Sequence, residues 1–274
     1  MISRVRPRLL MAAAVLVVVG AAALHLGSAK ADNQPPPASA SAGAAGAHDL
    51  IIGSSDSAQP QTMEEFLTAV TKDVDTFWTK QFADAGLPEP RVSYAWIPAG
   101  QTAASACGDE DGTLGDSAAA YCSGDDTIYI SEKFATDIYD GTLDNALPGS
   151  SQGYGKTMGD FAVAYIVAHE YGHQIQEELG LFQKYGDQVP TMAFELQADC
   201  FAGTWAESAG EQNRLEDGDV DEALDAALAV GDFDAGNPGH HGTPEQRADA
   251  WKAGFESGDP SSCDQYLDAA SYSS

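Results

Sequence analysis

Basic residues are scarce in this sequence. Its 274 residues include 13 Lys and Arg against 42 Asp and Glu, which gives a formal net charge of -29 at pH 7. A surface of that sign repels phosphate backbones and anionic lipid headgroups, so we expect no nucleic-acid partner. We assign most of the acidic residues to a solvated surface, which favours solubility outside the cell.

Cysteine is also rare, with four residues and no C-x-x-C pair. The lack of that pair argues against a zinc cluster built on cysteines. In an exported protein four cysteines can oxidise, and they allow three connectivities. We favour Cys107–Cys122, which would close a Gly- and Asp-rich loop, and Cys200–Cys263, which would tie the C-terminal tail to a predicted helix.

The N-terminus has the form of an export signal. Three arginines precede an apolar run over residues 9–26, and Ala29-Lys30-Ala31 resembles an A-x-A cleavage site. We predict that residues 1–31 are a signal peptide and that the protein is secreted. The run is also near the length that spans a bilayer, so the alternative is an uncleaved anchor holding the domain outside the plasma membrane. Membrane contact is expected only in that case.

Two regions follow the predicted signal. Residues 32–60 are rich in Ala, Ser, Pro and Gly and have too little apolar surface to fold, so we predict a disordered tether. Residues 61–274 have the length and patterning of one domain with a substantial core. They contain no internal repeat.

The apolar spacing predicts a mostly helical domain. Five segments have apolar residues at helical intervals: residues 62–85, 157–180, 190–210, 219–230 and the segment capped by Thr243. Thr157-x-x-Asp160 resembles a capping box at the start of the second, and Pro190 is suited to the first position of the third. Two short runs, residues 91–97 and 127–130, are predicted strands, and residues 98–120 between them are a predicted polar loop.

The most informative pattern is His169-Glu170-Tyr171-Gly172-His173, which lies inside one of the predicted helices. A helix turns about 100° per residue, so histidines four apart point the same way, one turn above each other. Both imidazoles can then bind one metal ion, while Glu170 sits on the flank, where a carboxylate can reach an activated water. We therefore predict a zinc site with Glu170 as general base.

A catalytic zinc needs a third protein ligand. The segment Glu195-Leu-Gln-Ala-Asp199 follows His173 at a distance that allows a loop and a return helix. We favour Glu195 as the ligand, with Asp199 one turn further on as the acceptor that orients a ligand imidazole. The reverse assignment, with Asp199 as the ligand, stays open.

His240 and His241 immediately precede the last predicted helix. A histidine at such a position can donate to a developing oxyanion, and it can equally close a turn. We take His241 as a second catalytic candidate and rank His240 below it.

Together these motifs resemble those of the bacterial neutral zinc metallopeptidases. The resemblance rests on His169–His173, on Glu195-Leu-Gln-Ala-Asp-Cys200, on His241-Gly-Thr-Pro-Glu-Gln-Arg247, and on the order of the cysteines. It spans roughly residues 62–267. The resemblance implies an α+β, zincin-like fold, mostly helical with a small antiparallel sheet. It also implies zinc bound by His169, His173 and Glu195, and catalysis by Glu170.

The sequence thus predicts a secreted zinc metallopeptidase of the gluzincin type that cleaves peptide or protein substrates. The alternative is a zinc-stabilised binding module of the cell exterior, without catalysis. A calcium-binding surface protein using Asp217–Asp221 is a weaker third hypothesis, because that run lacks the Gly and Glu of an EF-hand loop.

Overall fold

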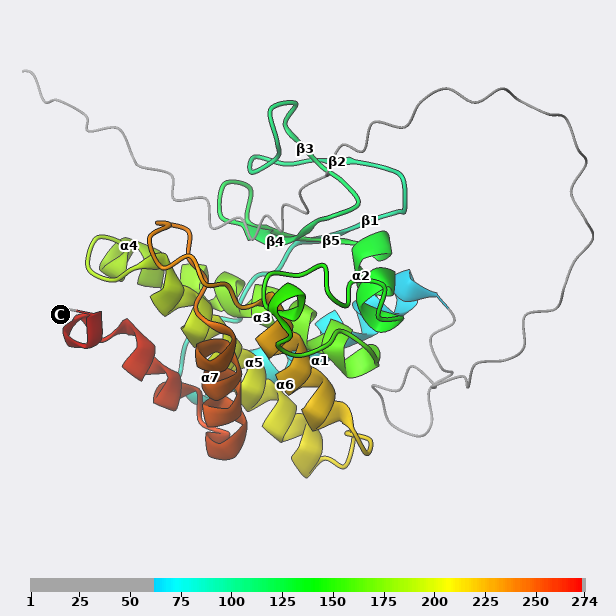
Figure 1. The fold of residues 1–274 in the computed structure, drawn as a ribbon. Helices are drawn as coiled ribbons and strands as arrows, with labels where there is room; N and C mark the ends of the chain where they lie inside the picture. The colour runs from blue at the N-terminus through cyan, green and yellow to red at the C-terminus, as the bar shows by residue number, and fades with distance from the viewer. Residues whose placement is uncertain (1–61, 273–274) are drawn as a thin grey trace, which may run out of the picture.

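Helix α3 (Asp160–Glu178), which contains the H-E-x-x-H pattern, lies at the centre of the fold in a computed structural model that describes residues 62–272 (Figure 1). The predicted signal peptide, residues 1–31, and tether, residues 32–60, fall outside the described residues. The described chain is an α+β domain, mostly helical with small sheets, as predicted. In this part of the chain no helix combines the length and apolarity needed to cross a membrane.

Every residue of α3 from Asp160 to Gln176 is buried. A helix without a polar face is one that is surrounded by other elements. On one side it contacts α1 (Met63–Asp84), α5 (Thr191–Glu211) and α6 (Asp219–Val230), and on another side it contacts the sheet and α2 (Glu132–Tyr139) (Figure 1). The residues that α3 carries are therefore held on a rigid support.

The predicted start of this helix at Thr157 is wrong. The backbone and hydroxyl groups of Thr157 both donate to Asp144, and the helix begins three residues later, after Gly159 at φ 100°. Its first turn is capped from another helix, because the carboxylate of Glu222 on α6 accepts the N–H of Phe161 at 3.0 Å. A local capping box is not needed where a distant carboxylate satisfies the same donors.

The main sheet has the order β1 (Tyr94–Ile97), β5 (Thr127–Ser131), β4 (Ala119–Cys122). β4 and β5 are antiparallel, but β1 and β5 are parallel, so the expected antiparallel sheet is a mixed one. The connection over residues 98–118 leads into β4, which runs opposite to β1, and the β4–β5 hairpin then turns the chain so that β5 lies beside β1 and parallel to it. This places β4 at the edge of the sheet, where it contacts α3.

The predicted polar loop contains more structure than expected. β2 (Ala103–Ala104) and β3 (Thr113–Leu114) pair antiparallel and project above the main sheet (Figure 1). The disulfide Cys107–Cys122, one of the two predicted pairs, ties this small lobe to the end of β4. After α2, a 3-10 turn, η1 (Ser150–Gln152), precedes α3.

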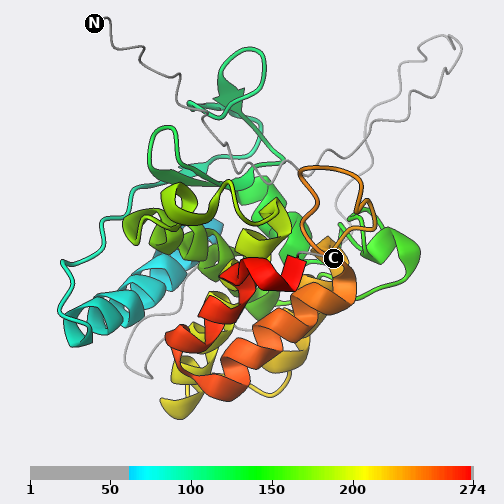
Figure 2. The ribbon, with the colours of Figure 1, turned by 90° about the vertical axis from the view of Figure 1, so that its left-hand side faces the viewer.

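The C-terminal third of the described chain packs onto α5. A short helix, α4 (Leu181–Tyr185), joins α3 to α5, and α7 (Pro244–Ser257) lies directly against α5. The 3-10 segments η2 (Pro260–Leu267) and η3 (Ala269–Tyr272) turn back beside α7, as Figure 2 shows. The second predicted disulfide, Cys200–Cys263, joins η2 to α5.

The contact between α5 and α7 depends on two glycines that face each other's helix. A Cβ atom at Gly254 of α7 would lie 2.0 Å from the carbonyl oxygen of Cys200, and one at Gly203 of α5 would lie 2.1 Å from that of Trp251. Neither position leaves room for a side chain. The two backbones therefore approach closely enough for a residue at the start of α7 to reach the functional face of α5.

Candidate metal centre

The two motif histidines lie on the face of α3 that meets α5. Their rings are fully or almost fully buried, with centroids 4.7 Å apart. Gly172, between them in sequence, allows this approach, because a Cβ there would lie 3.1 Å from the backbone of Ala198 on α5. The helical spacing and one small residue thus place both imidazoles against the second helix, as the motif predicted.

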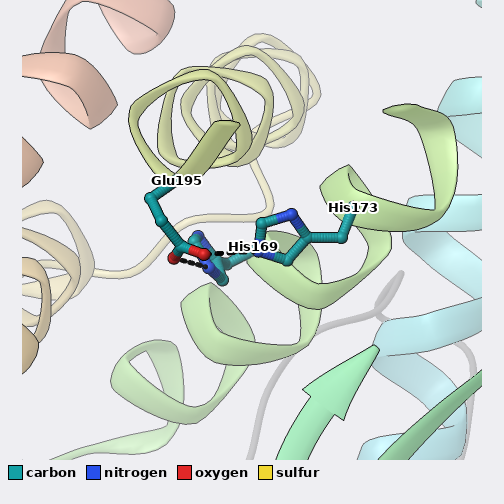
Figure 3. Close-up of side chains that lie close together, drawn as sticks. All are labelled: His169, His173 and Glu195. Atoms are coloured by element: carbon teal, nitrogen blue, oxygen red, sulfur yellow. Dashed lines mark ion pairs between the residues drawn. The ribbon is translucent and has the colours of Figure 1, made fainter. Parts of the chain in front are cut away.

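Glu195 of α5 completes the group (Figure 3). Its Oε2 lies 3.4 Å from His169 Nε2, and its Oε1 lies 3.5 Å from His173 Nε2. The three potential ligand atoms all lie within 4.8 Å of one another. Asp199 is not in this group, so the geometry favours the assignment of Glu195 over Asp199.

This donor set fits a metal ion. Both carboxylate oxygens of Glu195 and the Nε2 of His173 are buried and have no hydrogen-bond partner. A buried carboxylate without partners is strongly destabilising, and a cation bound between these atoms would satisfy all of them. Two imidazole nitrogens and one carboxylate oxygen are the ligand set of catalytic zinc sites.

The charges in the metal-free site are strongly coupled. Burial alone would lower the pKa of His169, but Asp199 and Glu195 outweigh burial and raise it to about 9. Burial would raise the pKa of Glu195, yet His173 and His169 hold it well below its usual range. The pocket is therefore built to keep Glu195 ionised, as a metal ligand must be.

Behind His169 lies a buried network that fixes its orientation. Its Nδ1 is 2.8 Å from Oδ1 of Asp199, the residue predicted to orient a ligand imidazole. Tyr165 donates to the same oxygen at 2.7 Å. Arg247 of α7 donates to both oxygens of Asp199, at 2.7 and 2.8 Å. With Nδ1 donating to Asp199, Nε2 is the nitrogen that offers a lone pair to a metal, once the metal has displaced the proton that the raised pKa favours.

His173 has a separate support that sequence reasoning missed. Its Nδ1 is 2.8 Å from Oε1 of Gln176, one turn further along α3. The Nε2 of Gln176 donates in turn to the carbonyl of Phe194 and to Gln197, both on α5. The i, i+3 spacing from His173 to Gln176 was visible in the sequence, but the partners on α5 were not.

Glu170 lies beside the ligand group and is held by the sheet. Its Oε2 accepts the backbone N–H of Tyr121 on the edge strand β4 at 2.7 Å. Only 1% of the residue is exposed. One carboxylate oxygen is thereby fixed. A backbone donor of this kind leaves no signal in the sequence.

The two adjacent histidines before α7 share one carboxylate, Asp232. His240 Nδ1 lies 2.5 Å from one oxygen of Asp232, and His241 contacts the other with its backbone N–H at 2.8 Å and its Nδ1 at 3.3 Å. His241 is close enough to Glu195 for their charges to interact. It stands near the metal centre without belonging to the ligand group. Asp232 was not singled out in the sequence.

An H-E-x-x-H helix that receives a third ligand from a neighbouring helix is the site architecture of zinc metallopeptidases. The sequence comparisons agree with that class. The chain belongs to the family described as "Putative neutral zinc metallopeptidase", whose sequence model matches residues 12–266.

Relatives occur in distant bacteria. The chain is 35% identical over 224 residues to the uncharacterized protein YpfJ of Escherichia coli K12. The aligned region covers 74% of this chain and 71% of that relative. It is 31% identical over 224 residues to the uncharacterized protein Rv2575 of Mycobacterium tuberculosis H37Rv, which covers 73% and 69%. No solved structure shows significant similarity to the chain.

Proposed function

We propose that this protein is a secreted zinc-dependent peptidase that hydrolyses peptide bonds in peptide or protein substrates. The observation that carries the proposal is the buried donor set of His169, His173 and Glu195, in which His173 Nε2 and both Glu195 oxygens have no hydrogen-bond partner, together with the restrained carboxylate of Glu170. Zinc held by these residues would lower the pKa of a water molecule and polarise a carbonyl group.

The chain's own residues supply the proton transfers. Glu170 takes the proton of the attacking water and passes it to the leaving amine, while the backbone N–H of Tyr121 fixes one of its carboxylate oxygens. Asp199 and Arg247 keep His169 in the ligand tautomer. His241, oriented by Asp232, donates to the oxyanion that forms as the water adds to the carbonyl.

The location of the protein follows the same reasoning. The two disulfides suit an oxidising compartment outside the cytoplasm, and the N-terminal sequence has the form of an export signal. In such a compartment, with a surface of net charge -29, a peptide or protein is the expected substrate and nucleic acid is not.

The test is the substitution Glu170→Gln, which preserves shape and removes the base. We expect bound zinc to be unchanged and cleavage of a broad peptide library to fall by roughly 10²–10⁴-fold. Glu177→Gln on the same helix is the matched control, because Glu177 is outside the ligand group and its carboxylate accepts a hydrogen bond from the exposed side chain of Gln183. It should behave as wild type.

Two results would count against the proposal. A Glu170→Gln protein with full activity would remove Glu170 from the mechanism. A zinc-loaded wild-type protein that cleaves no peptide would favour the alternative, a zinc-stabilised binding module.

A further inference from the structure

A groove of about 540 Å³ lies beside the metal centre, and none of the roles assigned above uses it. It is bounded by the start of α5, residues 235–240, the start of α7, and Tyr272 of η3. Met192 lines it and precedes Glu195 by three residues on α5, which is less than one helical turn, or ~5 Å along the axis. The groove therefore begins next to a proposed metal ligand.

A second connection runs through the histidine pair. His240 lines the groove, and its Nδ1 bonds Asp232, whose other oxygen holds His241 on the side of the metal centre. Asp232 thus contacts both His240, which lines the groove, and His241, the proposed oxyanion donor. A peptide extending from the scissile bond would reach the groove within a few residues.

The walls of the groove carry no Asp, Glu, Lys or Arg, although the chain has 42 acidic residues. Its apolar surface comes from five residues: Pro190, Met192, Ala235, Pro238 and Tyr272. An ammonium group would find no carboxylate there. A carboxylate would be repelled by the charge of the whole molecule.

The polar groups of the groove are mainly donors. Thr243 and Gln246 use their side-chain oxygens in the capping box of α7, where each accepts the other's backbone N–H. The oxygen of Asn237 accepts the N–H of Gly239. The amide NH₂ groups of Asn237 and Gln246 and the hydroxyl proton of Thr243 have no acceptor in the described part of the chain. His240 Nε2 can accept while Nδ1 donates to Asp232.

We propose that this groove binds an uncharged side chain of the peptide substrate, and that the primary amide of glutamine or asparagine is its preferred occupant. The donors match the amide carbonyl, His240 Nε2 matches the amide NH₂, and the apolar walls pack against the methylene groups. This inference rests on the proposed peptidase function and names the side-chain class that the same site selects.

Binding can be measured without catalysis. We would label methionine methyl groups with ¹³C in the zinc-loaded protein and titrate N-acetylglutamine methylamide, with the glutamate, lysine and leucine analogues for comparison. Met192 lines the groove, whereas Met63 and Met158 lie elsewhere and serve as internal controls. Met192→Leu identifies the resonance.

We expect the glutamine analogue to shift the Met192 resonance saturably, with at least tenfold higher affinity than the glutamate and lysine analogues and with the leucine analogue in between. An unmoved Met192 resonance, or an equal response to the charged analogues, would overturn the proposal.

A variant that fills the groove provides the second measurement. Ala235→Phe places a ring in the groove from an exposed position, and Ala83→Phe on α1 is the matched control at an exposed position elsewhere. Ala235→Phe should abolish the Met192 response and reduce cleavage of glutamine-containing library peptides at least tenfold, while sparing peptides with glycine or alanine at that position. Ala83→Phe should change neither.

The two proposals fail in different ways. If the Met192 resonance responds but no peptide is cleaved, the peptidase function is contradicted and the proposed binding role of the groove is supported. If peptides are cleaved equally well with and without the Ala235→Phe substitution, the peptidase function is supported and the proposed binding role of the groove is contradicted.

Discussion

At the scale of single residues, the candidate metal centre depends on the guanidinium group of Arg247 as well as on its three proposed ligands. Three carboxylates, Glu170, Glu195 and Asp199, are buried there. Arg247 donates to both oxygens of Asp199 and has an NH1 group 3.9 Å from Glu195. With neutral histidines, one divalent ion and Arg247 together balance the three carboxylates, so removal of Arg247 would leave buried negative charge uncompensated.

We therefore expect Arg247→Met to lower zinc affinity by roughly 10–100-fold, the usual effect of losing a residue that supports a ligand. Arg247→Lys should restore only part of it, because an ammonium cannot form the two-pronged contact with Asp199. Competition against a chromophoric chelator measures the affinity.

Arg214→Met is the matched control. Arg214 pairs with Asp73 at 2.7 Å, away from the metal centre, so its loss should lower the melting temperature and leave zinc affinity unchanged. Equal zinc affinities for the Arg247→Met and wild-type proteins would show that Arg247 does not support the site.

At the scale of elements, the closest helix contact is the one between α5 and α7. It brings Arg247 to Asp199, and it exists because Gly254 lets the helix backbone touch the carbonyl of Cys200. The candidate metal site thus depends on the contact between Gly254 and Cys200, although neither residue touches a proposed ligand.

Gly254→Ala should lower the free energy of unfolding by roughly 1–3 kcal/mol or more, because the added methyl group overlaps the carbonyl oxygen of Cys200. Zinc affinity should fall as well, since the helices must separate. Gly210→Ala, on α5, is the control: the nearest atom to its Cβ is the flexible Leu215 side chain at 3.3 Å, and alanine favours helix. Urea unfolding compares the two, and equal effects would contradict the role assigned to Gly254.

The contact between α3 and α6 predicts a dependence of stability on pH. Asp160, Asp219 and Glu222 place carboxylate oxygens within 4.8 Å of one another where the two helices begin. Burial, together with Asp160 and Glu222, raises the pKa of Asp219 to about 7 in the folded protein. An unfolded Asp releases its proton near about pH 4. The folded state therefore binds more protons between these values, and the free energy of unfolding decreases as pH rises from about 4 to 7.

Asp219→Asn cannot ionise, and its side-chain oxygen can still accept the N–H of Glu216. We expect this variant to lose less stability than wild type between pH 5 and pH 8, as measured by urea unfolding at each pH. Asp187→Asn changes the same charge at an exposed position and should keep the wild-type slope. Parallel curves for wild type and Asp219→Asn would rule out Asp219 as the titrating group.

The sequence predicted what local periodicity controls. The spacing of His169 and His173, the return helix with Glu195, and the cap at Thr243 all depend on residues within a turn or two of each other. What it could not predict depends on distant partners: Glu222 caps α3 across 61 residues. The parallel pairing of β1 and β5 has the same cause, because it depends on which strand of the β4–β5 hairpin lies beside β1.

The site shows the same division. Arg247 is the last residue of the motif that begins at His241, but the motif gives it no role. Its contact with Asp199 spans 48 residues and requires the α5–α7 packing. Tyr165 reads as a core aromatic until its hydroxyl meets Asp199. The backbone N–H that restrains Glu170 belongs to Tyr121, 49 residues away, and any residue except proline could donate there.

At the scale of the whole molecule, the two disulfides have different tasks. Cys107–Cys122 closes a separation of 15 residues and ties the β2–β3 lobe to β4, whereas Cys200–Cys263 closes 63 residues and fastens η2 to the helix that carries Glu195. In the chain-entropy model these loops stabilise the fold by about 3 and about 4 kcal/mol. The second is attached to the helix that carries a proposed metal ligand, whereas the first is attached next to Tyr121, which holds Glu170 and no ligand.

We expect the Cys200→Ser/Cys263→Ser protein to lose both stability and zinc affinity, because Gln197 and Asp199 lie on the same stretch of α5 as Cys200. The Cys107→Ser/Cys122→Ser protein should lose stability alone. Calorimetry gives the melting temperatures, and chelator competition gives the zinc affinities. If both pairs changed zinc affinity equally, the link between η2 and the site would be disproved.

The position of Arg247 late in the sequence also means that it is translated well after the histidine that it supports. His169 precedes it by 78 residues in the chain. At about 5–20 residues per second, a ribosome completes the H-E-x-x-H helix several seconds before the residue that steadies it exists. A nascent chain would carry the two histidines without their support throughout that interval. The supported site that we propose for zinc can therefore be complete only after translation has passed α7.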